Sequence, residues 1–347
     1  MPGASVLRWG LIGPGKIATQ FAGALEVVAD SCLYAVAGPD RQKAKKFACD
    51  HGAVTCHDSP CALLNDPDVD AVYIATPYRY HHQLVRDSLL AGKPVLCDKP
   101  LTVNARETQE LIELSRRNRV FLMEGLRTRF LPIYEEINQW LVAAKIGTVT
   151  STSSSFGIAF PRKLRDRMLD HDLADGALLD MGVYNLAMSH WVFGIQPARH
   201  SIDTRPGVTG IEEYGETTLT YSDGRYSKFT NSLTKQLAND FIIHGSHGHI
   251  RIHPTFWKST RATLVSGCDG NNTGESVTIC REFRATGLEY EIEAAARCIR
   301  SGLTECPGMS HDDTLDTMKL MDALRRDMGL VNDFEQPVSL LRTGSRR

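Results

Sequence analysis

Residues 91–100 read Ala-Gly-Lys-Pro-Val-Leu-Cys-Asp-Lys-Pro, a short apolar run that ends in a charged pair and a proline. The apolar run predicts a buried strand, and Pro100 cannot continue its hydrogen bonding. In an open α/β sheet, ligands bind at the carboxyl ends of the strands. An ammonium group there can polarise a substrate oxygen, so Lys99 is a candidate catalytic residue, although a lysine at a strand end can also simply reach into solvent.

The start of the chain contains a second junction between a predicted strand and a turn. Residues 6–12 form an apolar run, and Gly-Pro-Gly-Lys-Ile follows at 13–17, before an amphipathic stretch. In this context the first glycine permits a tight turn, and the second lets the backbone approach a pyrophosphate at the helix N-terminus. The pattern predicts a dinucleotide site. The residues assigned to it are Gly13, Pro14, Gly15, Lys16 and Ile17.

The residues after the second predicted strand, at 32–37, bear on the choice of cofactor. An acidic residue there would bond the ribose hydroxyls of NAD, whereas a small residue with a nearby cation accommodates the 2'-phosphate of NADP. Gly38, Arg41 and Lys43 favour NADP, with NAD as the alternative. Asp40 argues for NAD, unless it is the N-cap of a helix over residues 41–50.

Strand and helix patterns alternate up to about residue 123, which predicts βαβ units and a parallel sheet. Beyond residue 147 the chain contains many short β-type runs divided by turn signals, which predicts a large, mainly antiparallel sheet. We therefore predict an α/β plus α+β protein, with a Rossmann-type dinucleotide-binding domain in residues 1–124 and a substrate-binding and oligomerisation domain in residues 125–347. The predicted strands cover residues 69–75, 94–97, 120–123, 151–155, 212–221, 226–233, 240–244 and 249–253, and the predicted helices cover 79–91, 104–118, 133–144, 289–300 and 312–326.

Composition excludes several classes of partner. The 347 residues exceed the usual size of a single core, and a formal net charge of −2 provides no basic surface for nucleic acid or an anionic membrane. Nine cysteines without a Cys-x-x-Cys pair argue against a disulfide framework and against structural zinc. We see no secretory leader and no membrane-spanning run, and expect a cytoplasmic protein that acts on a small molecule.

A run of histidines at positions 244, 247, 249 and 253 raises the question of a metal site. His249 and His253 alternate with Arg251, as one face of a strand would, and the neighbouring glycines indicate a hairpin. We therefore predict no metal site.

Taken together, the motifs resemble those of the Gfo/Idh/MocA oxidoreductases. The resemblance covers nearly the whole chain and is closest to the branch of dihydrodiol and NADP-dependent D-xylose dehydrogenases. It implies that Thr76, Pro77, His81 and Asp98 lie beside the cofactor. The motifs are Gly13-x-Gly15-x-Ile17-Ala18, Thr76-Pro77-x-x-x-His81, residues 91–100, and Gly-Ala-Leu-Leu-Asp-Met-Gly-Val-Tyr at 176–184.

Asp180 and Tyr184 are four residues apart, so on a helix both would emerge from one face and could converge on Lys99. The resemblance implies that Tyr184 is the acid/base and that Asp180 orients Lys99 or the substrate. An ammonium beside a phenol favours its anion, which would help a residue with an ordinary pKa near ~10. Without the motif at 91–100, an ordinary helix with a half-buried tyrosine would explain the same pattern.

Two departures from the family pattern affect the substrate side. Tyr78 replaces a common asparagine, which leaves the contacts near the nicotinamide open. Arg127 stands where the closest branch has an aromatic residue, and it could recognise a carboxylate or a polyhydroxylated substrate, or form an ion pair with Glu124 or Asp98. Phe156 is also assigned to the substrate pocket.

The sequence thus predicts hydride transfer between NAD(P) and a CH–OH or C=O group of a sugar, polyol or cyclic diol. The enzyme class would be a dehydrogenase acting on CH–OH donors or, alternatively, one acting on a CH–CH donor. A non-catalytic, cofactor-binding regulator of the same family is the alternative. The alternating residues of the predicted strand 226–233 suggest an exposed sheet face, through which we expect a homodimer or a tetramer.

Overall fold

A computed structural model describes residues 6–161, 176–194, 196–207, 211–267 and 274–330. Its N-terminal part is a six-stranded parallel sheet in the order β3-β2-β1-β4-β5-β6. This order confirms the predicted Rossmann-type sheet, and its topological switch point lies between β1 and β4. The strands are β1 (Leu7–Ile12), β2 (Ser31–Ala37), β3 (Thr55–His57), β4 (Ala71–Ile74), β5 (Val95–Asp98) and β6 (Leu122–Gly125).

Helices cover the parallel sheet, which explains why its strands are almost continuously apolar. Val95, Leu96 and Cys97 of β5 are fully buried, as the opening sequence stretch predicts. Asp40 caps α2 by accepting hydrogen bonds from the N–H groups of Gln42 and Lys43, which confirms its predicted structural role. The helices are α1 (Lys16–Leu25), α2 (Arg41–Asp50), α3 (Pro60–Leu64), α4 (His81–Leu90) and α5 (Ala105–Asn118).

The C-terminal part is built on an eight-stranded sheet in the order β14-β13-β12-β11-β7-β10-β9-β8. Only β7 and β10 pair in parallel, so the sheet is mainly antiparallel, as predicted. The strands are β7 (Val149–Gly157), β8 (Arg199–Pro206), β9 (Glu212–Thr220), β10 (Tyr226–Ser232), β11 (Phe241–Gly245), β12 (Gly248–Ile252), β13 (Arg261–Ser266) and β14 (Glu275–Cys280).

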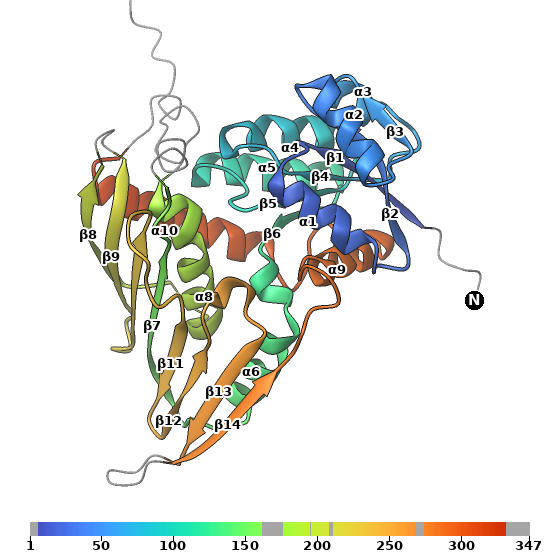
Figure 1. Cartoon of the computed structure of the whole chain (residues 1–347). Helices are drawn as coiled ribbons and strands as arrows, with labels where there is room; N and C mark the ends of the chain where they lie inside the picture. Colours follow the sequence, from blue (N-terminus) through green and yellow to red (C-terminus); the bar gives the residue numbers. More distant parts are fainter. Residues whose placement is uncertain (1–5, 162–175, 195, 208–210, 268–273, 331–347) are drawn as a thin grey trace, which may run out of the picture.

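Among the described residues, four further helices connect and cover the two sheets (Figure 1). α10 packs against α5 of the N-terminal part and against α8 and β8 of the C-terminal part, while α9 packs against α1. The last helices therefore tie the two parts together. These helices are α6 (Pro132–Val142), α8 (Val183–Phe193), α9 (Glu289–Arg300) and α10 (His311–Asp327).

One face of the second sheet is covered and the other is open. Along β10, Ser227 and Phe229 are buried, whereas Tyr226 and Lys228 are exposed. The alternation matches the sequence prediction, but the exposed side carries polar as well as apolar groups. Self-association through this face stays a prediction.

Candidate active site

Lys99 lies where the two parts of the molecule meet. It follows directly after β5, and its ammonium nitrogen lies 2.7 Å from Oδ1 of Asp180 and 2.6 Å from the Asp180 carbonyl oxygen. The residue is only 8% exposed, so this contact between a cation and a carboxylate is largely shielded from solvent. The structure thus brings together two of the three residues that the sequence singled out.

Asp180 lies in a π-helical turn, η4 (Leu178–Gly182), which leads into α8. The sequence argument considered Asp180 and Tyr184 on one regular helix, whereas the structure places Asp180 in this π-turn and Tyr184 in α8. π-turns widen a helix locally and are frequent at functional sites. Here the turn directs both the backbone carbonyl and the carboxylate of Asp180 toward Lys99.

Glu212 holds the start of this turn in place. Its Oε1 accepts a hydrogen bond from the Leu178 N–H at 2.9 Å. Burial raises the pKa of Glu212, and this effect is larger than the lowering caused by that hydrogen bond. Gly176 adopts a φ of 151°, and a Cβ there would lie 2.6 Å from the same oxygen. The approach of Glu212 therefore requires glycine at position 176. The pattern at 176–184 could not have revealed this contact, because Glu212 lies on β9, outside the motif.

Tyr184 lies on α8 with its ring centre 5.0 Å from the Lys99 ammonium. Burial raises the pKa of Tyr184, and this effect outweighs the opposing influence of Lys99 and Arg127. Lys99 does act to lower the pKa of Tyr184, as expected from the sequence, but the effect of burial is larger. Tyr184 holds its proton, which suits a proton donor.

Lys99 remains charged despite its burial. Burial acts to lower its pKa, but the attraction of Asp180, with smaller contributions from Tyr78, Tyr184 and Asp98, raises the pKa of Lys99 well above its ordinary value. The site thus holds a fixed positive charge beside a neutral phenol.

Tyr78 is a member of this cluster that sequence reasoning did not identify. It begins η1 (Tyr78–Tyr80), just after β4, and its hydroxyl donates a hydrogen bond to Asp180 Oδ1 at 2.5 Å. The same hydroxyl lies 3.4 Å from the Lys99 nitrogen. The one available signal was the departure from asparagine at this position.

His81 is fully buried, and both of its ring nitrogens contact backbone oxygens. Nδ1 lies 2.9 Å from the Pro100 carbonyl and Nε2 lies 2.8 Å from the Thr76 carbonyl. Burial lowers the pKa of His81, and this effect is larger than the opposite effect of the two carbonyl contacts. The ring therefore links the loop after β4 to the loop after β5, and each of its nitrogens already contacts a backbone carbonyl oxygen.

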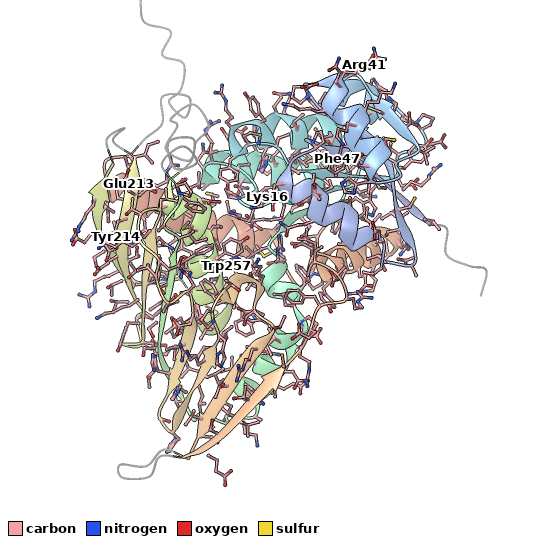
Figure 2. The ribbon with its side chains drawn as sticks, viewed as in Figure 1. Lys16, Arg41, Phe47, Glu213, Tyr214 and Trp257 are labelled. Atoms are coloured by element: carbon pink, nitrogen blue, oxygen red, sulfur yellow. The ribbon has the colours of Figure 1, made fainter. Side chains whose placement is uncertain are left out.

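A cavity of about 600 Å³ lies at the switch point of the parallel sheet. Two features of the cavity fit a dinucleotide. A Cβ added at Gly15 would meet no atom within 4 Å, so there is open space beside the backbone, and no side chain caps the N-terminus of α1, where a phosphate can bind. Lys16 stands at the same helix end (Figure 2). The cavity is lined by Ile12, Gly13, Pro14, Gly15, Gly38, Pro39, Asp40, Lys43, Pro60, Ala75, Thr76, Pro77, Tyr80, Gln83 and Leu84.

The two cations considered for a 2'-phosphate lie differently. Lys43 lines the cavity, whereas Arg41 forms an ion pair with Asp58 at 2.7 Å and extends outward from α2 (Figure 2). Gly38 also lines the cavity, but a Cβ there would lie only 2.7 Å from Cδ of Pro14. Lys43 is therefore the better placed residue for testing cofactor choice.

Arg127 connects three segments rather than pairing with Glu124 or Asp98. It lies in η2 (Arg127–Phe130), and its Nη1 donates to Gln20 Oε1 at 3.0 Å and to the Thr286 carbonyl at 3.3 Å. Its charge nevertheless lowers the pKa of Tyr184, though less than burial raises it and less than Lys99 lowers it. Arg127 is thus electrostatically coupled to the site.

Aromatic side chains surround Tyr184. The ring of Phe156 stacks on that of Trp257 at 3.5 Å and lies 5.8 Å from the ring of Tyr184. Trp257 belongs to η5 (Phe256–Lys258) and lies at the centre of the molecule (Figure 2). These rings form an apolar wall on the C-terminal side of the site.

Glu291, on α9, is a buried acid close to the cluster. Both of its carboxyl oxygens lack a hydrogen-bond partner among the described residues, and burial raises its pKa to about 8, with Asp98 and Glu289 adding to the shift and Arg127 opposing it. Since the ordinary value is 4.5, an unfolded chain releases this proton at a lower pH than the folded protein does. Folding therefore becomes less favourable as the pH rises from about 4.5 to about 8.

We predict that Glu291→Gln raises the melting temperature at pH values above 8, and that this gain shrinks as the pH falls toward 4.5. The amide is neutral at every pH. It therefore removes the free-energy cost of burying an ionisable carboxyl group above its unfolded-state pKa, which is of the order of a few kcal/mol. Thermal unfolding across this pH range measures the effect. Glu293→Gln, two residues along the same helix in a surface ion pair with Arg284, is the control. A gain that does not vary with pH would contradict the prediction.

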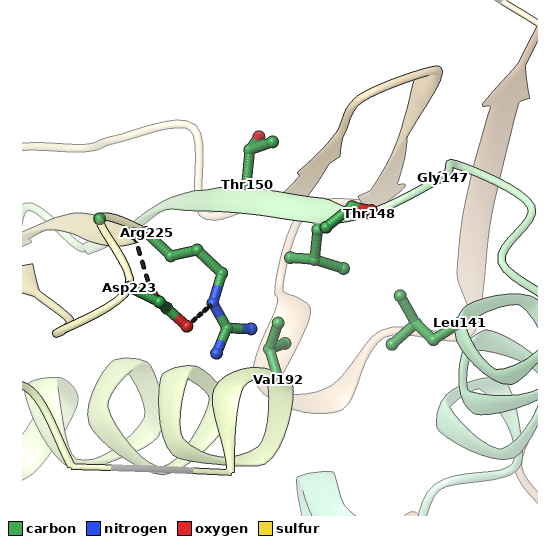
Figure 3. Close-up of a pocket in the computed structure, with 9 residues that line it drawn as sticks. Leu141, Gly147, Thr148, Thr150, Val192, Asp223 and Arg225 are labelled. Carbon is green, nitrogen blue, oxygen red and sulfur yellow. Dashed lines mark hydrogen bonds and ion pairs between the residues drawn. The ribbon is translucent and has the colours of Figure 1, made fainter.

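A second hollow, of about 640 Å³, lies on the C-terminal part (Figure 3). Leu141 and Val192 line it together with an ion pair between Asp223 and Arg225, in which Nε and Oδ2 are 2.7 Å apart. No residue of the Lys99 cluster lines it.

Within the residues that the structure describes, no group of three or more His, Cys, Asp or Glu side chains could hold a metal ion. The described helices include none long and apolar enough to cross a membrane.

Comparison with known proteins gives two family matches. Residues 7–126 match the oxidoreductase family with an NAD-binding Rossmann fold, and residues 134–251 match the GFO/IDH/MocA C-terminal domain. Among curated relatives, trans-1,2-dihydrobenzene-1,2-diol dehydrogenase from Xenopus tropicalis is 33% identical over 93% of this chain and 98% of its own length. The Homo sapiens enzyme of the same name is 30% identical over 93% of this chain and 97% of its own length.

Solved structures agree with the sequence comparison. A 3-ketoreductase from Actinomadura kijaniata, in complex with NADP and TDP-benzene, matches with a TM-score of 0.82 and 27% identity over 93% of this chain and 98% of that one. An aldose-aldose oxidoreductase from Caulobacter crescentus, with a TM-score of 0.83, 20% identity and the same two coverages, shares the fold.

Proposed function

This chain belongs to the Gfo/Idh/MocA family of NAD(P)-dependent oxidoreductases, and from that premise we propose that it interconverts a CH–OH and a C=O group of a sugar, polyol or cyclic diol. Lys99, Asp180 and Tyr184 handle the proton. The observation that carries the proposal is a buried ammonium, held by Asp180 beside the phenol of Tyr184, at the carboxyl end of β5. The loop after the neighbouring strand β4 lines the dinucleotide cavity.

A nicotinamide dinucleotide held by the cavity would supply the hydride for reduction and accept it in oxidation. In reduction, the substrate oxygen gains negative charge, and Tyr184 donates its phenolic proton to that oxygen. Lys99 stabilises the charge that develops on the substrate oxygen and on the phenol. Asp180 keeps the ammonium in position through its carboxylate and its backbone carbonyl. In oxidation, Tyr184 takes the proton back, so higher pH favours that direction.

Several observations support this class of substrate. The relatives are a dihydrodiol dehydrogenase and a 3-ketoreductase crystallised with NADP. Phe156 and Trp257 offer an apolar wall to a ring, and Arg127 contributes positive charge. We propose that Gly13, Pro14, Gly15, Lys16 and Ile17 hold the pyrophosphate, that Gly38, Lys43, Thr76, Pro77, His81 and Asp98 shape the remaining cofactor site, and that NADP is preferred to NAD.

The test is turnover by the purified wild-type protein. NADPH oxidation is followed with a panel of keto sugars and cyclic ketones, and NADP reduction with sugars, polyols and trans-dihydrodiols. The proposal expects sustained turnover with at least one member. Tight NADPH binding without turnover across the panel would instead favour the alternative, a non-catalytic regulator.

Cofactor choice gives a second prediction. Lys43→Glu places a negative charge at the cavity wall, and we expect it to weaken NADPH binding by about tenfold while leaving NADH binding nearly unchanged. Lys46→Glu, on the same helix but paired with Asp50 on the surface, is the matched control. Fluorescence titrations with both cofactors measure the effect. An equal loss for NADPH and NADH would show that Lys43 does not contact the 2'-phosphate.

Three further features remain proposals. We propose a domain boundary at residue 124, a cytoplasmic location that rests on the cysteine pattern, and a homodimer or tetramer formed through the open face of the second sheet. The mass of the protein in solution, from light scattering, tests the last of these.

A further inference from the structure

Tyr78 and Lys99 both contact one oxygen of Asp180. The Tyr78 hydroxyl lies 2.5 Å from Oδ1, and the Lys99 nitrogen lies 2.7 Å from the same atom. Tyr78 and Lys99 come from neighbouring strand ends of the parallel sheet, whereas Asp180 comes from the turn before α8. The Asp180 carboxylate is therefore held by two donors from the N-terminal part.

The direction of the hydrogen bond follows from the partners. An ionised carboxylate can only accept, so the Tyr78 hydroxyl donates its proton to Asp180. Bonds of this charge-assisted kind are stronger than bonds between neutral groups. Lys99 directs one N–H to the same oxygen and another to the Asp180 carbonyl, and the Tyr78 hydroxyl oxygen, at 3.4 Å, is a weaker third partner.

We propose that Tyr78 is a positioning residue, which acts through Asp180 to keep the carboxylate ionised and locked against Lys99. The inference rests on the proposed function, because it concerns the geometry of the same proton-handling groups. Nothing in the motif pattern assigns this role to position 78, where a tyrosine replaces the usual asparagine.

The phenolic ring of Tyr78 has its own contacts, so the hydroxyl can be tested separately. The ring meets His81 edge-on at 5.8 Å, and the Lys99 nitrogen lies 5.5 Å from its centre. Phenylalanine keeps both contacts and loses only the hydroxyl. Tyr78→Phe is therefore a suitable variant.

The groups that face Asp180 determine the expected effect. Burial raises the pKa of Asp180, but the charge and hydrogen bond of Lys99 and the hydrogen bond of Tyr78 together lower it. The other titratable groups of the cluster, Asp98 and Tyr184, face Lys99. Without the Tyr78 hydroxyl, Asp180 takes up a proton at a higher pH and releases Lys99.

The experiment measures kcat and KM for carbonyl reduction against pH. Tyr78→Phe is expected to lower kcat more than it changes KM, and to move the acid limb of the profile to higher pH by about one unit, the value of one hydrogen bond to a charged group. Tyr34→Phe removes a phenol that donates to a carboxylate elsewhere on the N-terminal part, 3.3 Å from Asp68, and is expected to leave the limb in place. Circular dichroism at each pH verifies that all variants are folded.

A double variant tests whether Tyr78 acts through Asp180. In an Asp180→Asn background the acid limb no longer reports that carboxyl group, and adding Tyr78→Phe is expected to cause no further shift. An unmoved limb in Tyr78→Phe, or an equal shift in both backgrounds, would overturn the inference. Since these outcomes require an active wild type, they are distinct from the failure of the proposed function, in which the wild type itself has no turnover.

Discussion

Lys99→Ala is expected to lower kcat by about a hundredfold or more, the usual cost of losing a preorganised charge at a reacting oxygen. The variant removes the ammonium that lies 2.7 Å from Asp180 and faces the ring of Tyr184. Cofactor binding should remain measurable, because the cavity at Gly13 to Gly15 is lined by other residues. Steady-state kinetics and an NADPH fluorescence titration measure the two effects separately.

Lys46→Ala is the matched control, because this lysine pairs with Asp50 on the surface of α2. It is expected to retain full turnover. If Lys99→Ala turned over at nearly the wild-type rate, Lys99 would have no part in the mechanism. If it lost cofactor binding together with turnover, its role would be to hold the dinucleotide.

Tyr184→Phe is expected to reduce kcat by about a hundredfold or more as well, within the range for loss of a general acid. KM should change little, since the ring and its contacts with Phe156 and Trp257 are kept. Because burial keeps the phenol protonated, the loss should be largest for carbonyl reduction near neutral pH, where Tyr184 is the donor. Initial rates of NADPH oxidation measure it.

Tyr226→Phe provides the control, since Tyr226 is exposed on the second sheet and distant in the fold from Lys99. Its kinetics should equal those of the wild type. A Tyr184→Phe variant with undiminished kcat would assign the proton to another group, such as water.

The parallel sheet was predictable because its signal is local. Residues 95–97 form a fully buried apolar run with a proline close behind, and Asp40 caps a helix that starts at the next residue. The strands β3, β8, β13 and β14 were missed, and for β8 and β14 the reason is the opposite one. β8 contains Arg199, Asp203 and other polar residues without regular apolar alternation, and β14 is an exposed edge strand, so both owe their conformation to pairing with β9 and β13.

The candidate site was predictable only in part. Lys99, Asp180 and Tyr184 could be identified because each lies in a recognisable motif, and the structure places them close together. Tyr78, Glu212 and Glu291 could not be assigned, since their contacts depend on how distant elements pack. The sequence indicated the effect of Lys99 on the pKa of Tyr184 but not the larger, opposite effect of burial, because burial is a tertiary property.

The most direct test of the account compares Lys99→Ala, Tyr184→Phe and the double variant in the same assay of NADPH-dependent reduction. If the two residues form one proton-handling unit, the double variant should be about as slow as the slower single variant, because removing either one already disables the unit. If the two losses in kcat multiply in the double variant, Lys99 and Tyr184 act independently, and the central claim is wrong.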